Sequence, residues 1–172
     1  MDLSKAIKGR RSIRAYKKED VPEEIVDKLV EAASWAPSAG NIQPWVFVVV
    51  RKPGNKVPLA EAAGQAFIAE ASVVIVVCAN EERSSLGYGF RGKSLFCIQD
   101  TAAAIQNMLL TGHSLGLGTC WIGAFDEDEA RKAIRAPVGM RPVAIIPVGY
   151  ADEAPAPRRR RPVAQIVVHE SF

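Results

Sequence analysis

The segment from Ser72 to Ala79 constrains the fold of this chain more than any other. It is rich in valine, contains no charged residue and has the length of one β-strand. A continuous apolar run of this length, without polar alternation, is typical of a strand that is buried on both faces. The sequence therefore predicts a sheet whose central strand is covered on both sides by other elements.

Helical and strand patterns surround this run in an irregular order. Helices are predicted over Leu3–Gly9, from Pro22 to before Pro37, and over Leu59–Ala69, Leu95–Leu115 and Asp126–Arg135. Further strands are predicted over Trp45–Val50, Leu117–Ile122, Pro142–Tyr150 and Val163–Val168. Because the helices are unequal and the order is not a regular βαβ repeat, we expect an α+β fold in one domain over residues 1–172, with a central mixed sheet flanked by helices.

The last predicted strand lies beyond a connector that is rich in proline and alanine, Ala151 to Pro157. A strand at the end of such a connector can reach the sheet of a second copy of the chain. The sequence therefore predicts a homodimer in which the C-terminal strand is exchanged.

Composition excludes several classes of protein. The longest apolar run, Ala71 to Ala79, is far shorter than the roughly 20 residues of a membrane helix, and Met1 does not lead into a secretory signal. The net charge of +3 suits an anionic ligand such as a phosphate but does not require nucleic acid. Only two histidines and no paired-cysteine motif are present, so we expect no metal site. The three cysteines are expected to be buried thiols of a cytoplasmic protein.

Two motifs in the first quarter of the chain could bind a ligand. Arg10-Arg11-Ser12-Ile13-Arg14 could form an anion cradle, because guanidinium groups pair with phosphate through two hydrogen bonds; it could equally be a basic, solvated turn. The segment Ala36–Trp45 combines small residues with Ser38, Asn41 and Gln43, which could contact the edge of a flat heterocycle. Its alternative is a loop rich in turn-forming residues.

Two further motifs lie toward the C-terminus. The segment Gly116–Phe125 has neither the dinucleotide-binding GxGxxG spacing nor the Lys-Ser/Thr of a phosphate-binding P-loop. It could still direct a backbone N–H at a ring nitrogen, or Trp121 could simply be a core aromatic. The run Arg158–Arg161, followed by Pro162, could be a solvated basic segment, a nucleic-acid or membrane patch, or part of a phosphate site.

The order and spacing of these motifs, together with the helical stretch Ile98–Leu110, resemble the nitroreductase family of flavoproteins over essentially the whole chain. The resemblance implies an intimate homodimer that holds FMN at its interface. It places Arg10, Arg11, Ser12 and Arg14 at the phosphate, ribityl chain and pyrimidine side of FMN, and Arg158 and Arg160 at the phosphate. It places Pro37, Ser38, Ala39 and Asn41 on the segment that the partner subunit contributes, and Trp121, Ile122 and Gly123 along the flavin ring, with the Gly123 N–H near N5.

The activity implied by the resemblance is an oxidoreductase that reduces FMN with NADH or NADPH. The acceptor, such as a nitroaromatic, a quinone or an activated alkene, would then react at the same face in a ping-pong cycle, with no catalytic acid or base from the protein. The family's longer members carry helices between the positions of Ala79 and Leu95, where this chain has a short, glycine-containing segment, which predicts an open site.

Two other functions are compatible with the same residues. A carrier of FMN or a flavin-based sensor would share the phosphate-binding residues but would not turn over NAD(P)H. A nucleic-acid-binding module would use the run Arg158–Arg161, although the acidic run Asp126–Glu129 and the modest net charge disfavour it. No residue pattern distinguishes NADH from NADPH or identifies the acceptor.

Overall fold

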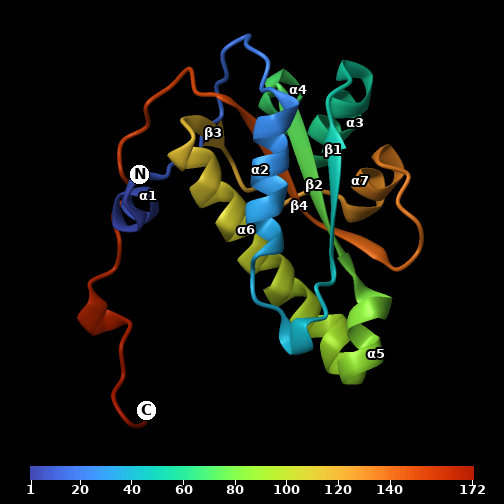
Figure 1. The fold of residues 1–172 in the computed structure, drawn as a ribbon, viewed down its shortest axis with the longest axis vertical. Helices are drawn as coiled ribbons and strands as arrows, with labels where there is room; N and C mark the ends of the chain where they lie inside the picture. Colours follow the sequence, from blue (N-terminus) through green and yellow to red (C-terminus); the bar gives the residue numbers. More distant parts are fainter.

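The structure is a computed structural model that describes residues 1–172. Its centre is a four-stranded antiparallel sheet with the strand order β1-β2-β4-β3 (Figure 1). The strands are β1 (Trp45–Val50), β2 (Val73–Asn80), β3 (Leu117–Thr119) and β4 (Met140–Tyr150). Every residue of β2 from Val73 to Ala79 is buried, so the prediction of a central strand covered on both faces is confirmed.

Seven α-helices surround this sheet in an α+β arrangement, as expected from the sequence. They are α1 (Leu3–Gly9), α2 (Glu23–Ser34), α3 (Pro53–Ala63), α4 (Phe67–Glu70), α5 (Glu81–Arg91), α6 (Cys97–Ser114) and α7 (Glu127–Ala133). The sheet itself differs from the expectation of a mixed one, because all of its strand pairs are antiparallel. Parallel pairing is limited to one isolated bridge between Ser12 and Thr119. The helices between successive strands therefore connect strands of an antiparallel sheet.

The alternation of side chains along β2 divides the core into two layers. Val73, Ile75 and Val77 pack into one cluster with residues of α2 and α6. Val74, Val76 and Cys78 pack into the other with residues of α3, α4 and α7. Successive residues of a strand point to opposite faces, so one uninterrupted apolar run fills both layers. This is why the strand shows no polar alternation.

Proline and glycine determine where the helices end. The helix α2 begins directly after Pro22, carries Glu23 and Glu24 in its first turn, and ends before Pro37, as predicted. The single helix predicted over Leu59–Ala69 is instead two helices. Gly64 adopts a left-handed conformation (φ 60°) and its N–H caps the end of α3, and α4 starts only at Phe67.

The segment between β2 and α6 is helical rather than an irregular loop. The helix α5 is kinked at Tyr88 and Gly89, and a π-helical turn, Gly92–Phe96, joins it to α6. Gly89 (φ 53°, ψ −139°) has a conformation that other residues avoid. Two glycines therefore allow the chain to fold back here, and the second, Gly92, lies against the backbone of Ser84.

Replacing Gly92 with alanine is expected to destabilise the fold by about 1–3 kcal/mol through overpacking. A methyl group at this position would lie 2.3 Å from the carbonyl oxygen of Ser84, and backbone cannot move aside as a flexible side chain can. Gly54→Ala is the matched control, because it is also a helical glycine and a methyl group there meets nothing within 4 Å. Chemical denaturation of both variants measures the difference; equal stabilities would contradict the close packing at Gly92.

The C-terminal segment does not form the predicted strand in the single chain. Val163–Gln165 is a short 3-10 turn, the side chains from Val163 to Val168 are exposed, and the segment lies apart from the sheet (Figure 1). A strand requires a neighbouring edge for its hydrogen bonds, and none is within reach of this tail. Exchange of this segment with a second copy stays a prediction. None of the helices has the length and apolar character needed to span a bilayer.

Candidate functional site

A pocket of about 200 Å³ brings together the arginines from the two ends of the chain. Its lining consists of Arg10, Arg11, Ser12, Arg14, Pro155, Ala156, Arg158 and Arg160. The first four belong to the segment after α1, and the last four belong to the connector after β4. Residues that are about 150 positions apart in the sequence thus line one pocket, which we call the arginine pocket.

Backbone hydrogen bonds explain this convergence. The N–H of Ile13 donates to the carbonyl of Thr119 in β3 (3.0 Å), which fixes the N-terminal segment at the edge of the sheet. Farther along, Lys17 N–H donates to the carbonyl of Tyr150 (2.9 Å), and Asp152 N–H donates to the carbonyl of Ala15 (2.9 Å). The N-terminal segment therefore runs beside the beginning of the connector, and the connector carries its arginines back to Arg10–Arg14.

The guanidinium groups in the arginine pocket are engaged unequally. Arg11 donates to the carbonyls of Lys8, Gly9 and Arg10 (2.7, 3.0 and 2.9 Å), so it caps the C-terminal end of α1. The guanidinium groups of Arg10, Arg14 and Arg158 form no hydrogen bond or ion pair with the protein. Since no carboxylate lines the pocket, these cations fit an anionic ligand with several acceptor oxygens, such as the phosphate of FMN.

Two ionisable side chains lie next to the arginine pocket without adding charge to it. Burial raises the pKa of the Cys120 thiol, and the opposing effects of Arg14 and of a hydrogen bond with Ser12 are smaller. Burial, assisted by the positive charges of Arg10 and Arg11, lowers the pKa of His113 below its ordinary value of 6.5. At neutral pH both groups are therefore uncharged, and arginine supplies the positive charge.

The segment from Pro37 to Gln43 lies at the opposite end of α6 from the arginine pocket. Asp100, near the start of α6, accepts a hydrogen bond from Ala39 N–H (3.1 Å). His113, near the end of α6, lies against Gly9, where a methyl group would be 2.6 Å from the His113 Nε2. These two anchor points are 13 residues apart, or about 20 Å along a helix. One chain thus does not bring Pro37, Ser38, Ala39 and Asn41 to the arginine pocket.

Hydrogen bonds within this segment define its shape. Ser38 Oγ accepts from Gln43 N–H (3.0 Å), and the amide of Gln43 donates to Asn41 Oδ1 (3.1 Å). Asn41 and Gln43 both have a positive φ (56° and 53°), a conformation that asparagine tolerates and most residues avoid. The segment is a constrained turn that exposes Pro37 and Asn41 on the surface.

Trp121, Ile122 and Gly123 come one residue after the end of β3 and lie near the arginine pocket, since Thr119, the last residue of β3, pairs with Ser12. The side chain of Ile122 is buried in the core, and its backbone pairs with Ile145. The N–H and the carbonyl of Ile122 both hydrogen-bond to Ile145 (3.0 Å each), so Ile122 has no free polar group to offer a ligand. Trp121 is 39% exposed, so it is a surface aromatic and not the core residue of the alternative interpretation.

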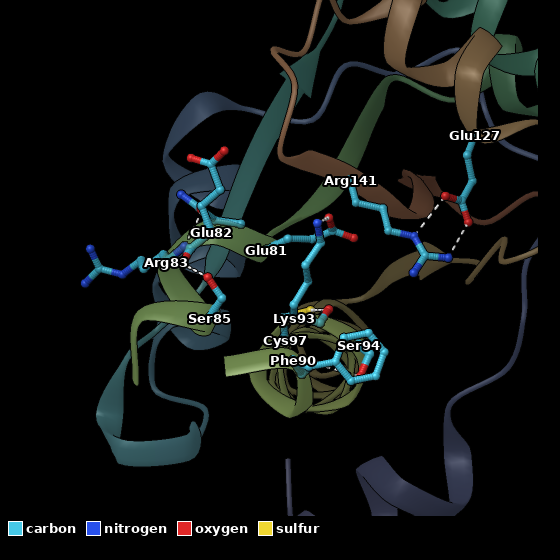
Figure 2. A network of polar contacts seen from close by, with 11 residues as sticks. Glu81, Glu82, Arg83, Ser85, Phe90, Lys93, Ser94, Cys97, Glu127 and Arg141 are labelled. Carbon is cyan, nitrogen blue, oxygen red and sulfur yellow. Dashed lines mark hydrogen bonds and ion pairs between the residues drawn. The ribbon is translucent and has the colours of Figure 1, made fainter. Parts of the chain in front are cut away.

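A second cluster of charged residues, between α5, α7 and β4, differs from the arginine pocket in that its cations are paired (Figure 2). Arg141 forms two hydrogen bonds with Glu127 (2.9 and 2.7 Å), and Lys93 lies 3.5 Å from Glu81. The hydrogen bonds from Arg141 hold the pKa of Glu127 below its ordinary value of 4.5. This cluster ties β4 to α7 and needs no external anion.

The Arg141–Glu127 pair should make stability depend on pH. Because the pKa of Glu127 is lower in the folded chain, its contribution is complete above about pH 4.5 and is lost as the pH falls through the lowered pKa. The side chains are about half exposed, so the contribution is at most about 1 kcal/mol. Denaturant unfolding of Glu127→Gln and of the unaltered chain between pH 7 and pH 3 measures this contribution. The difference between their free energies of unfolding should decrease as the pH falls, and a difference that stays constant would contradict the role of this pair.

Glu153, a carboxylate that contacts the N-terminal arginine segment, could not be identified from the sequence. Its Oε1 accepts hydrogen bonds from the backbone N–H groups of Arg14 and Ala15. Nothing in the sequence separates Glu153 from the neighbouring Asp152, because both are acidic residues in a proline- and alanine-rich connector. Only the fold shows that one of them reaches the N-terminal segment.

Comparison with known proteins gives consistent matches. The sequence model of the Nitroreductase family matches residues 7–70 and 53–150. A Methanothermobacter thermautotrophicus protein with the provisional name NADH dehydrogenase/NAD(P)H nitroreductase is 39% identical over 164 residues, covering 92% of this chain and 82% of that protein. A Bacillus subtilis protein named FMN reductase [NAD(P)H] is 26% identical over 185 residues, covering 99% of this chain and 74% of that protein. A solved structure from Parabacteroides distasonis, with the same provisional name as the first, has a TM-score of 0.88 and 31% identity, covering 99% of this chain and 98% of that one.

Proposed function

The chain belongs to the nitroreductase family, and on this premise we propose that it is an oxidoreductase that binds FMN and takes electrons from NADH or NADPH. The names of its relatives, NAD(P)H nitroreductase and FMN reductase, support the flavin and the nicotinamide donor. The main structural support for the proposal is the arginine pocket. The guanidinium groups of Arg10, Arg14 and Arg158, which line it, form no hydrogen bond or ion pair within the protein. A phosphate supplies the acceptor oxygens that these cations lack.

The residues of the arginine pocket have distinct roles in this proposal. Arg10, Arg158 and Arg160 would hold the phosphate of FMN, and Ser12 would donate a hydrogen bond beside it. Arg11 would act mainly through α1, whose end it caps. Arg14 would lie toward the pyrimidine side of the ring, where its cation stabilises the negative charge that reduction adds.

Residues after β3 would complete the site along the ring. Trp121 would offer its exposed face, and the backbone N–H of Gly123 would donate a hydrogen bond near N5. When bound, FMN supplies the redox chemistry, which is uptake of a hydride at N5 from NAD(P)H and then reduction of an acceptor such as a nitroaromatic, a quinone or an activated alkene in a ping-pong cycle. The chain contributes binding, orientation and charge, and no acid or base of its own.

A complete site in this proposal needs two copies of the chain. Pro37, Ser38, Ala39 and Asn41 lie at the far end of α6 from the arginines of their own chain, so they would reach the FMN of a partner. The exposed apolar side chains of the tail, Val163 to Val168, would become covered by exchange with that partner. Each chain would still act as one domain over residues 1–172, since both of its ends contribute to the same arginine pocket.

Anaerobic titration of the FMN-loaded protein with NADH and then with NADPH tests this function. Loss of the visible flavin absorption with either donor is the expected result, and the donor that acts at lower concentration is the preferred one. Flavin that binds but stays oxidised would identify a carrier or a sensor instead. Absence of FMN binding would overturn the assignment altogether.

A further inference from the structure

The C-terminal arm, residues 154–172, forms no hydrogen bond with the rest of the chain. The last backbone tie is the hydrogen bond from Asp152 N–H to Ala15, and the next residue is Glu153. Beyond Glu153, every hydrogen bond of the arm stays within the arm, including those of Arg160 and Arg161. The position of Arg158 and Arg160 over the arginine pocket therefore depends on the contacts made just before the arm, and Glu153 supplies the last hydrogen bonds among them.

The Glu153 side chain joins the residues before the C-terminal arm to the N-terminal segment by hydrogen bonds. Its Oε1 accepts from the N–H groups of both Arg14 and Ala15, the latter at 3.2 Å. Two adjacent N–H groups that point to one oxygen form a small anion-binding site, which the carboxylate occupies. Glu153 lines the neighbouring hollow of about 470 Å³, beside Arg10 and His113, and not the arginine pocket itself. It therefore holds the arm without filling the place of the phosphate.

We infer that Glu153 is a positioning residue for the phosphate of FMN, since it holds the arm that carries Arg158 and Arg160 against the segment that carries Arg10 and Arg14. This inference rests on the proposed function. Glu153 has two opposite effects on a bound phosphate. Its hydrogen bonds place the arginines, which favours binding, whereas its negative charge opposes the nearby anion.

Two variants separate these effects. Glu153→Ala removes the hydrogen bonds and should weaken FMN binding by about tenfold, the usual cost of losing a charge-assisted hydrogen bond. Glu153→Gln keeps an acceptor oxygen at the same position and removes the charge, so it should bind FMN at least as tightly as the unaltered chain. Asp152→Ala is the matched control, because it removes the same charge one residue away and its side chain forms no hydrogen bond. It should change FMN affinity by less than about twofold.

Riboflavin, which lacks the phosphate, distinguishes positioning of the arm from a general loss of structure. For each variant, quenching of flavin fluorescence gives the dissociation constants of FMN and of riboflavin. Thermal melting gives the unfolding temperature of each variant, and the titrations are carried out below it. Glu153→Ala should lower the affinity for FMN and leave that for riboflavin unchanged. An equal loss for both flavins, or no loss for FMN, would overturn the role of Glu153 while the proposed function stands. Failure of the unaltered chain to bind FMN would overturn both.

Discussion

Replacing Arg14 and Arg158 together with alanine is expected to weaken FMN binding by about 100-fold or more. Each guanidinium has no partner in the protein and is free to form charge-assisted hydrogen bonds with the phosphate or the ring edge. The loss of one such interaction costs about 1.5–3 kcal/mol, or roughly 10- to 150-fold in affinity, and the two arginines come from opposite ends of the chain. Titration of FMN fluorescence against each single variant and the double variant measures the effect.

The arginine run itself provides the control for this prediction. Arg159 lies between Arg158 and Arg160 in the sequence but does not line the arginine pocket. Arg159→Ala removes the same charge from the same arm, so it should weaken FMN binding by only about twofold, through the general field of the arm. If Arg159→Ala and Arg158→Ala weakened binding equally, the run would attract FMN by charge alone and the pocket would have no specific role.

Replacing Leu29 with alanine is expected to destabilise the fold by about 2–5 kcal/mol. Leu29 has no solvent exposure, belongs to the core cluster between α2, α6 and the sheet, and lies against Gly112 of α6. The change leaves a cavity beside the helix that separates the arginine pocket from the Pro37–Gln43 segment. Denaturant unfolding measures the loss.

Leu86→Ala is the matched control for Leu29, because the same substitution is made where the side chain is 90% exposed. Its effect should stay within about 0.5 kcal/mol. A small loss at Leu29, comparable to that at Leu86, would mean that α2 does not pack on α6 as described.

Elements with a strong local signal could be predicted from the sequence. The apolar run of β2 and the proline boundaries of α2 give both the type and the limits of these elements, because burial and φ restriction act locally. The break at Gly64 was missed, since alanines on both sides continue the helical pattern across it. The tail from Val163 to Val168 has the composition of a strand but no neighbouring edge in its own chain, and composition cannot supply one.

The candidate site could be predicted from local sequence patterns only in part, because its residues come together only in the folded chain. Each arginine cluster alone is compatible with a solvated basic segment. Long-range hydrogen bonds, including those from the N–H groups of Ile13, Lys17 and Asp152, bring the two clusters together. These bonds join segments that are more than 100 residues apart, and the local periodicity of a sequence cannot predict such long-range pairs. The resemblance to a family led to the expectation that both clusters belong to one site. The structure adds that Arg11 caps the end of α1 and that Glu153 accepts a hydrogen bond from the N-terminal segment.

A crystal structure of the protein with FMN would show whether arginines from both ends of the chain form one phosphate site. We expect the phosphate in the arginine pocket, within hydrogen-bonding distance of Arg10 or Arg14 and also of Arg158 or Arg160. We also expect Ser38 or Asn41 of a second copy beside the same flavin. A phosphate bound elsewhere, or contacted by arginines from only one end of the chain, would contradict this expectation.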